Sequence, residues 1–273
     1  MAAKAEKRSR LVRTFKDNNS VLILVIMLFV AFIAVDGYGS GFYNVIRYTA
    51  MYGPVCLGLA LVMITGNIDL SAGFQAGLAG VTSVVCFNAV YHASGNSVLS
   101  LVVAIVGCLL TGLITGFING FFVAKFKLHP FIVTLGTQLI LYTCLLLYVQ
   151  MGNNKGMAIS NLDPSYTNFV KGSLFKIGGV PIPNYVLFAI VLTAVMWFIW
   201  NKTTFGKNMF ALGSNEEAAR VSGVNVFAVT VGVFALAGAM YGFTGFIEGA
   251  RIGSNTANTG LNYELDAIAA CVI

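Results

Sequence analysis

The chain has 273 residues, of which 58% are hydrophobic and 10% are charged, and its formal net charge is +6. Average soluble domains contain about 25% charged residues, so this composition excludes an ordinary soluble globule, a disordered chain and a basic nucleic-acid-binding domain. The apolar runs are continuous, unlike the alternating pattern of a transmembrane barrel. The fold class that remains is all-α, a polytopic helical membrane protein, and at ~20 residues per span the length allows about seven or eight spans.

The first two apolar runs, at 21–35 and 45–65, follow a basic N-terminal segment, 1–20. A basic segment before a short apolar run also fits a cleaved signal peptide, but further spans follow, so we expect an uncleaved first helix. The third run, 70–91, is the least typical because it contains several polar side chains, among them Ser71, Gln75 and Asn88.

The later elements complete one transmembrane domain, 21–273. A fourth span is predicted at 98–124 and a fifth at 130–149. A polar external loop follows at 151–184, with three prolines and room for short strands. The remaining elements are a sixth span at 185–200, a charged cytoplasmic segment at 201–225, a seventh span at 226–246 and an apolar run that begins near Glu264 and continues to Ile273. We therefore treat the number of spans as a lower bound.

The distribution of basic residues predicts the orientation of these spans. With the N-terminus inside, 11 of the 16 Lys and Arg residues are cytoplasmic and five are outside. Basic residues that flank spans remain in the cytoplasm, so the sequence predicts a multi-pass protein with its N-terminus inside. Membrane lipid is the expected surrounding, and nucleic acid is not an expected partner.

Two features of the spans predict helix packing. Gly112, Gly116 and Gly120 lie four residues apart on one helix face, and Gly238 and Gly242 repeat this spacing. Such small residues allow helix backbones to approach closely. We interpret the intramembrane amides of Asn119 and Gln138 as interhelical hydrogen-bond partners.

The segment 201–225 carries the strongest functional signal. Ser214 followed by Glu217 has the spacing of a capping box, and Gly223 can end a helix in the left-handed conformation. The helix between them has about two turns, too few to be stable alone in water. It either docks on a soluble partner or packs as a capped connector on its own bundle, and the residues leave both readings open.

The same segment resembles the cytoplasmic coupling-helix motif of sugar-importing ABC permeases, which include the ribose, xylose and galactose/methyl-galactoside types. Gly66 to Gly73, read as GNIDLSAG, is similar to the G-x-x-D-L-S-x-G signature of that family. A third similar stretch runs from Tyr263 to Ile273. The combined motifs most resemble the galactose/methyl-galactoside type, although Asn67 stands where many members carry glycine.

The resemblance implies a homodimeric permease in the bacterial inner membrane, with an ABC ATPase subunit and an external sugar-binding protein as partners. The chain has no G-x-x-x-x-G-K-[ST] phosphate loop, so ATP and magnesium are expected on the partner ATPase and no cofactor on this chain. The expected ATPase-coupling residues are Gly213, Asn215, Glu217, Ala218, Ala219, Arg220, Ser222 and Gly223. We expect a transport subunit rather than an enzyme, with no catalytic residue and no metal site.

The expected residues of the translocation path or gate are Asp69, Ser71, Gln75, Asn88, Glu264 and Asp266. Asp69 can line a gate or cap the helix that follows it, and we favour the cap because a helix N-terminus attracts an acid. Glu264 and Asp266 can similarly cap a helix at the outer side, beside Arg251. All three acids are predicted near span ends, where water reaches.

Two other function classes remain to be compared. An ion-coupled secondary transporter would use an intramembrane acid as its ion site, with Asp69, Glu248, Glu264 and Asp266 as the candidates. An intramembrane enzyme would need a nucleophile and base or paired metal ligands, and the sequence contains no such constellation. The family resemblance favours galactose or a galactoside over ribose, but the residues do not identify the sugar.

Overall fold

The computed structural model describes residues 26–27, 30, 38–151, 156–159, 162–177 and 180–272. The chain divides after Tyr48 into two units, Met1–Tyr48 and Thr49–Ile273. The described part of the first unit includes the start of helix α3 (Tyr38–Ile64), where the guanidinium of Arg47 lies 5.2 Å from the centre of the Tyr43 ring. The predicted first span, 21–35, lies almost entirely outside the described residues.

Helices dominate the second unit, and six described helices are long and apolar enough to cross a membrane. This confirms the all-α membrane fold class, and each helix overlaps one of the predicted spans from the second to the seventh. They are α3, α4 (Ala72–Ser94), α5 (Ser97–Phe126), α6 (Pro130–Met151), α8 (Asn184–Lys202) and α11 (Val226–Ile252).

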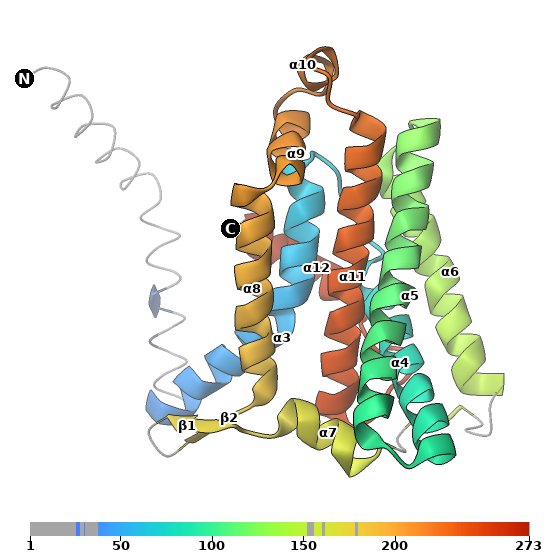
Figure 1. The fold of residues 1–273 in the computed structure, drawn as a ribbon, viewed down its shortest axis with the longest axis vertical. Helices are drawn as coiled ribbons and strands as arrows, with labels where there is room; N and C mark the ends of the chain where they lie inside the picture. Colours follow the sequence, from blue (N-terminus) through green and yellow to red (C-terminus); the bar gives the residue numbers. More distant parts are fainter. Residues whose placement is uncertain are drawn as a thin grey trace, which may run out of the picture. The chain divides into compact units, whose positions relative to one another are not determined.

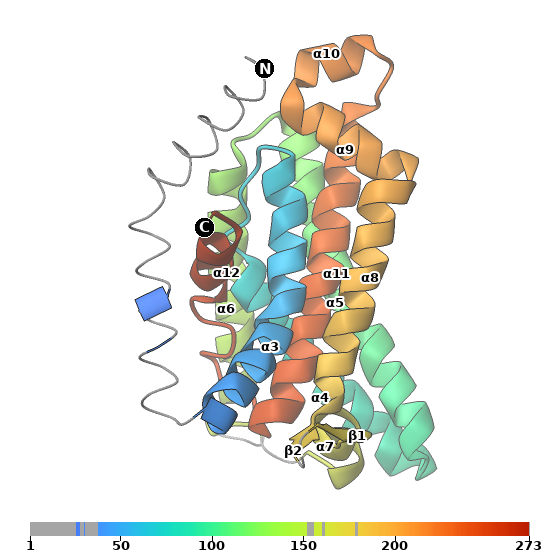
Figure 2. The ribbon, with the colours of Figure 1, turned by 90° about the vertical axis from the view of Figure 1, so that its left-hand side faces the viewer.

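Helix α11 forms the centre of the bundle and packs mainly on α5 and α4 (Figures 1 and 2). The glycine spacing explains the close crossing with α5. A Cβ atom at Gly112 or Gly116 of α5 would collide with a backbone oxygen of α11, at Gly238 or Phe234. The predicted role of this glycine ladder in helix packing is therefore confirmed.

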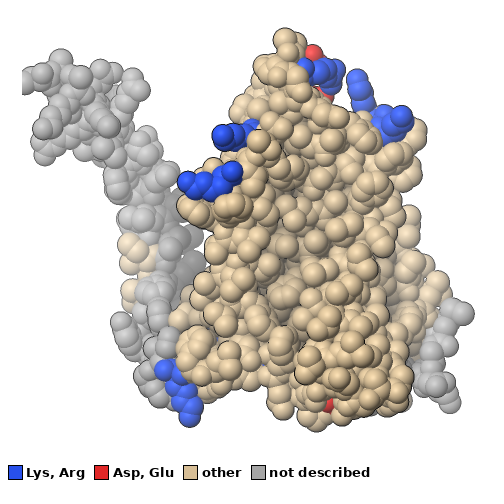
Figure 3. Space-filling model, viewed as in Figure 1, with Lys and Arg blue, Asp and Glu red and all other residues tan. Residues whose placement is uncertain are grey.

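The outer sides of α6 and α8 expose large apolar side chains, as a lipid-facing surface requires. Leu139 and Ile140 of α6 are 61% and 64% exposed, and Ile190 of α8 is 59% exposed. On the face drawn in Figure 3, the Lys and Arg side chains lie mainly near the end where α9 and α10 are found, and the flanks below are tan. On this face the exposed charges thus lie away from the apolar middle.

The segment predicted as an external loop, 151–184, contains more structure than expected. Helix α7 (Pro164–Lys171) begins after Asp163, whose carboxylate accepts a hydrogen bond from the Ser165 N–H at 2.7 Å. Strands β1 (Phe175–Ile177) and β2 (Val180–Ile182) then form an antiparallel pair with Phe175 opposite Ile182. The short strands agree with the prediction, whereas α7 was not predicted.

A non-helical loop meets the start of α4 inside the bundle. The linker 65–71 joins α3 to α4, and the loop 253–262 joins α11 to α12 (Tyr263–Val272). A Cβ atom at Gly73 would collide with the carbonyl oxygen of Gly260, and one at Gly260 would collide with that of Gly73. Gly260 also has a φ of +87°, a value that L side chains rarely adopt. Both glycines are therefore needed where the loop meets α4.

Candidate functional site

The segment between α8 and α11 folds into two short helices at the end of the unit opposite α7 (Figure 1). They are α9 (Thr204–Ser214) and α10 (Glu216–Val221), joined by the single residue Asn215. We call residues 204–223 the coupling segment. Its second helix matches the predicted short helix in position and length.

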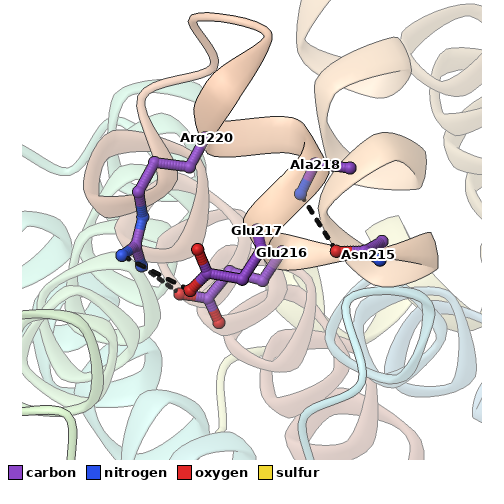
Figure 4. A network of polar contacts seen from close by, with 5 residues as sticks. All are labelled: Asn215, Glu216, Glu217, Ala218 and Arg220. Carbon is purple, nitrogen blue, oxygen red and sulfur yellow. Dashed lines mark hydrogen bonds and ion pairs between the residues drawn. The ribbon is translucent and has the colours of Figure 1, made fainter.

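The start of α10 differs from the predicted capping box. Asn215 is the N-cap, with φ −164° and ψ 109°, and its side-chain oxygen accepts a hydrogen bond from the Ala218 N–H at 3.0 Å (Figure 4). Ser214 is still helical, as the last residue of α9, and its hydroxyl donates to the Phe210 carbonyl at 2.8 Å. An N-cap residue needs a non-helical backbone, so the predicted Ser214 cap is wrong. The N-cap residue of α10 is the next residue, Asn215.

The charged side chains of α10 pair with one another rather than with the cap. Arg220 lies 2.6 Å from a carboxylate oxygen of Glu216 and 3.6 Å from one of Glu217 (Figure 4). All three side chains are exposed, and such pairs contribute about 0.2–1 kcal/mol each. These ion pairs therefore determine the charge pattern of the α10 surface and contribute little to the stability of the helix.

Gly223 ends α10 as predicted. Its φ is +85°, its N–H donates to the Arg220 carbonyl at 3.1 Å, and the N–H of Val224 donates to the Ala219 carbonyl at 3.0 Å. The left-handed stop is confirmed. A Cβ atom at Gly223 would have no heavy atom within 4 Å, so the site has space for a side chain although the backbone disfavours one.

Little of α10 is covered by the rest of the chain. Ala219 is its one buried residue, at 3% exposure, whereas the apolar side chain of Val221 is 88% exposed. Beside the helix lies a groove of about 450 Å³. Its lining residues come from the 65–71 linker, the end of α5, α10 and the start of α11; they are Asn67, Val123, Ala124, Lys127, Glu216, Arg220, Val224, Asn225, Val226, Phe227 and Thr230.

The structure brings three of the predicted path residues together in a buried network at the start of α4. Asp69, Ser71 and Gln75 are each 0% exposed. The Asp69 carboxylate accepts hydrogen bonds from the Ser71 N–H at 2.9 Å and from its hydroxyl at 2.6 Å, and the Gln75 amide donates to the Ser71 hydroxyl at 2.8 Å. Asp69 thus caps the backbone one residue before α4 rather than the first turn itself.

Two neighbouring helices complete this network. The Asn119 amide of α5 donates to the Ser71 hydroxyl at 2.8 Å, and its oxygen accepts from the Thr137 hydroxyl of α6 at 2.6 Å. Thr115 of α5 donates to the Gln75 side-chain oxygen at 2.9 Å. We call Asp69, Ser71, Gln75, Thr115, Asn119 and Thr137 the α4 network. Asn119 is confirmed as an interhelical hydrogen-bond partner.

The protonation of Asp69 reflects its position in the linker between α3 and α4. Burial raises the pKa of its carboxyl to about 6, while the hydrogen bonds from the Ser71 hydroxyl and N–H lower it. Desolvation therefore outweighs the hydrogen bonds. Asp69 was expected near a span end where water reaches, and that expectation is wrong, because the linker turns back into the bundle.

Glu264 is also more deeply placed than predicted. It is 4% exposed, and its carboxylate accepts a hydrogen bond from the Gln138 amide of α6 at 3.3 Å, which confirms Gln138 as an interhelical partner. Its other carboxylate oxygen has no hydrogen-bond partner within the described structure. A Cβ atom built on Gly73 would lie only 2.5 Å from that oxygen. The loop 253–262 carries Glu264 to the start of α4, not to the outer rim.

The remaining predicted residues lie apart from the α4 network. Asn88 is half-buried and lies about 20 Å farther along α4 than Gln75, at 1.5 Å per residue. Asp266 is exposed on α12 and accepts a hydrogen bond from the Tyr52 hydroxyl. Arg251, expected beside Glu264 and Asp266, instead forms a two-point ion pair with Glu248, with both N–O distances at 2.8 Å.

Some members of these clusters were missed at the sequence level. Thr115 and Thr137 belong to the α4 network, and the hydroxyl of Tyr263 hydrogen-bonds to the paired Glu248. The signal for Thr115 was available, since it lies four residues before Asn119 on the same helix face. The contact between Tyr263 and Glu248 depends on the path of the loop 253–262, which periodicity does not reveal.

The six membrane-length helices of the described residues, with a short helical segment at one end, define a multi-pass helical membrane protein. The family model described as "Branched-chain amino acid transport system / permease component" matches residues 41–273. No solved structure matches the chain significantly.

Three relatives illustrate the similarity. The galactose/methyl galactoside import permease protein of Haemophilus influenzae is 37% identical over 238 residues, which cover 85% of this chain and 69% of the relative. Its counterpart in Escherichia coli K12 is 37% identical over 236 residues, covering 84% and 69%. The ribose import permease protein of E. coli K12 is 30% identical over 266 residues, covering 94% and 76%.

The chain therefore belongs to this family of ABC importer permeases, which confirms the family predicted from the motifs. With its membrane-length helices, it is a multi-pass inner-membrane protein. The relatives are named as permease proteins, and their names place them in sugar import.

Proposed function

We propose that the chain is the transmembrane subunit of an ATP-driven sugar importer and passes a sugar from an external binding protein to the cytoplasm. The relatives that share 37% identity import galactose or methyl galactoside by name, so a galactoside or a related monosaccharide is the proposed substrate. The proposal includes a homodimer that forms one translocation path and places the N-terminus in the cytoplasm.

The observation that carries this proposal is the exposure of α10. A helix of six residues is too short to be stable in isolation, yet this one is capped at both ends and projects an uncovered Val221. Its exposed surface, with Val221 88% exposed and a groove beside Glu216 and Arg220, leaves room for a contact with another protein. The proposed contact is a groove on the ATPase subunit.

A second element of the proposal is the role of the candidate path residues. Asp69, Ser71 and Gln75 bond to one another and are fully buried, which suits a closed gate at the start of α4 more than an open sugar site. Glu264 and Asp266 are proposed to face the path from α12. Asn88 is proposed as a contact nearer its other end.

Co-purification in mild detergent tests the proposal directly. The tagged protein should bring down an ATPase subunit in near-equal amount, and Gly223→Arg should abolish this while membrane insertion persists. The matched control is Gly253→Arg, because Gly253 also has a positive φ, +81°, and open space around its Cβ position, but lies at the other end of α11. Equal ATPase recovery with both variants would refute the docking role of α10.

Sugar uptake in the presence of an ionophore separates the proposal from an ion-coupled transporter. Uptake that persists after the ion gradient collapses supports ATP as the energy source, whereas uptake that stops with the gradient favours ion coupling. In that second case the buried acids Asp69 and Glu248 become the residues to replace. Glu248 is already paired with Arg251, which disfavours it as a free ion site.

A further inference from the structure

One contact between the coupling segment and the main bundle brings two backbones very close together. A Cβ atom at Gly213 of α9 would collide with the carbonyl oxygen of Ile64, the last residue of α3, and would lie 3.3 Å from the Cα of Thr65. Although part of Gly213 is exposed, the direction of its missing side chain points at α3. No L side chain fits there unless α9 moves away.

Helix α9 is anchored in the hydrophobic core just before this contact. Met209 and Leu212, on its inner face, are 0% and 6% exposed and belong to the main hydrophobic core. Asn215 alone separates α9 from α10. Because only one residue joins the two helices, we expect a displacement of α10 to move α9 as well.

The chain beyond Ile64 is equally restrained. The Thr65 hydroxyl donates to the Val62 carbonyl at 2.8 Å, and the Asn67 amide donates to the Thr65 hydroxyl at 2.9 Å and its carbonyl at 3.2 Å. Asn67 also lines the groove beside Glu216 and Arg220 of α10. The coupling segment therefore borders this corner at two separate places, one at Ile64 and one at Asn67.

The corner leads directly into the bundle interior. Asp69 follows Asn67 by two residues and is fully buried in the α4 network. Through Ser71 that network reaches Asn119 of α5, which lies seven residues, about 10 Å, before the end of its helix. A shift of the corner would thus change the start of α4, where Glu264 and the loop 253–262 also converge.

We propose that Gly213 is a positioning residue that transmits movement of the coupling segment through the 64–67 corner to the α4 network. This inference rests on the proposed function and names the internal side of the coupling contact. Gly213 was expected to face the ATPase, and the geometry assigns it instead to the contact with α3. The supporting observations are the backbone contact of Gly213 with Ile64 and the hydrogen bonds that restrain Thr65, Asn67 and Asp69.

The test uses the complete transporter, with its ATPase and binding protein, reconstituted in proteoliposomes. Gly213→Ala is compared with Gly136→Ala, whose Cβ would have no heavy atom within 4 Å. Gly213→Ala should reduce sugar transport at least tenfold while ATPase co-purification is unchanged and ATP hydrolysis remains within about twofold. Gly136→Ala should leave all three unchanged.

Three results overturn the inference. If the Gly213→Ala variant transports sugar at the unmodified rate, the contact with α3 is not needed. If sugar transport and ATP hydrolysis fall in proportion, the substitution causes a general structural defect. If Gly213→Ala does not reach the membrane, Asn67→Ala must produce the same split between transport and hydrolysis, and its failure to do so counts equally against the inference. If the unmodified chain binds no ATPase, the proposed function fails instead.

Discussion

The hydroxyl of Thr137 makes the shortest hydrogen bond between helices in the α4 network, at 2.6 Å to the side-chain oxygen of Asn119. Thr143, on the same helix, donates only to the Leu139 carbonyl of its own turn in the described structure. We expect Thr137→Val to lower the free energy of unfolding by about 1 kcal/mol, because Asn119 loses its donor inside the bundle.

The matched control for this change is Thr143→Val, which should alter stability by less than about 0.5 kcal/mol. Denaturation of the purified protein in detergent micelles measures both variants. Equal stability of the two would mean that the α4 network contributes no net stabilisation and that its polar groups are retained for another reason.

At the same residue scale, the sequence predicted polar partners better than it predicted their depth. Asn119 and Gln138 were recognisable because amides inside apolar helices need hydrogen-bond partners. The depth of Asp69 and Glu264 was not recognisable. Asp69 lies in a non-helical segment and Glu264 follows one. Whether such a segment runs outward to water or back into the bundle depends on long-range contacts such as the one between Gly73 and Gly260.

At the scale of elements, α10 depends on its cap. Asn215→Ala removes the acceptor for the Ala218 N–H and should destabilise the helix by about 1 kcal/mol. That corresponds to roughly fivefold faster hydrogen exchange in residues 216–221. Ser214→Ala, at the residue that the capping-box pattern had indicated, should leave exchange unchanged. Faster exchange with Ser214→Ala alone would restore the original capping-box interpretation.

The crossing of α5 and α11 supplies a second test at this scale. Gly112→Ala places a Cβ against the carbonyl oxygen of Gly238 and should lower stability by roughly 1–3 kcal/mol, because the helices must separate. Gly53→Ala meets only the Cβ of Ala189 at 4.0 Å, so it should preserve stability or increase it through better helix propensity. Thermal unfolding in detergent compares them, and a neutral Gly112→Ala would contradict the close crossing.

Helix α7 was not predicted because its own sequence gives little indication of a helix. Helix α7 has eight residues in a polar stretch with prolines, and it is fixed by Tyr166, whose hydroxyl hydrogen-bonds to Ser83 at 2.8 Å and to the Phe246 carbonyl at 3.1 Å. Those partners lie on α4 and α11, far away in the sequence. The six long described helices needed no such information, since each is predominantly apolar and close to or above the ~20 residues of a membrane span.

At the scale of the whole molecule, the long helices of the second unit separate two polar ends. The coupling segment lies at one end, and α7 with the β1–β2 pair lies at the other (Figures 1 and 2). The α4 network and Glu264 lie between, where the loop 253–262 meets the start of α4. In a bilayer, non-helical backbone at this depth is tolerated where protein buries it or where it lines a water-filled cavity, and here the protein buries Asp69 and Glu264.

The proposed orientation places the coupling segment inside the cell and α7 outside, and two exposed residues allow it to be measured. Leu174, before β1, is 75% exposed, and Val221 of α10 is 88% exposed. In a background with the five native cysteines replaced, Leu174→Cys should react with a membrane-impermeant maleimide in right-side-out vesicles. Val221→Cys should react only after the vesicles are opened, because the bilayer separates it from the reagent. The reverse pattern would place α10 outside the cell, where no ATPase could reach it, and would contradict both the orientation and the proposed function.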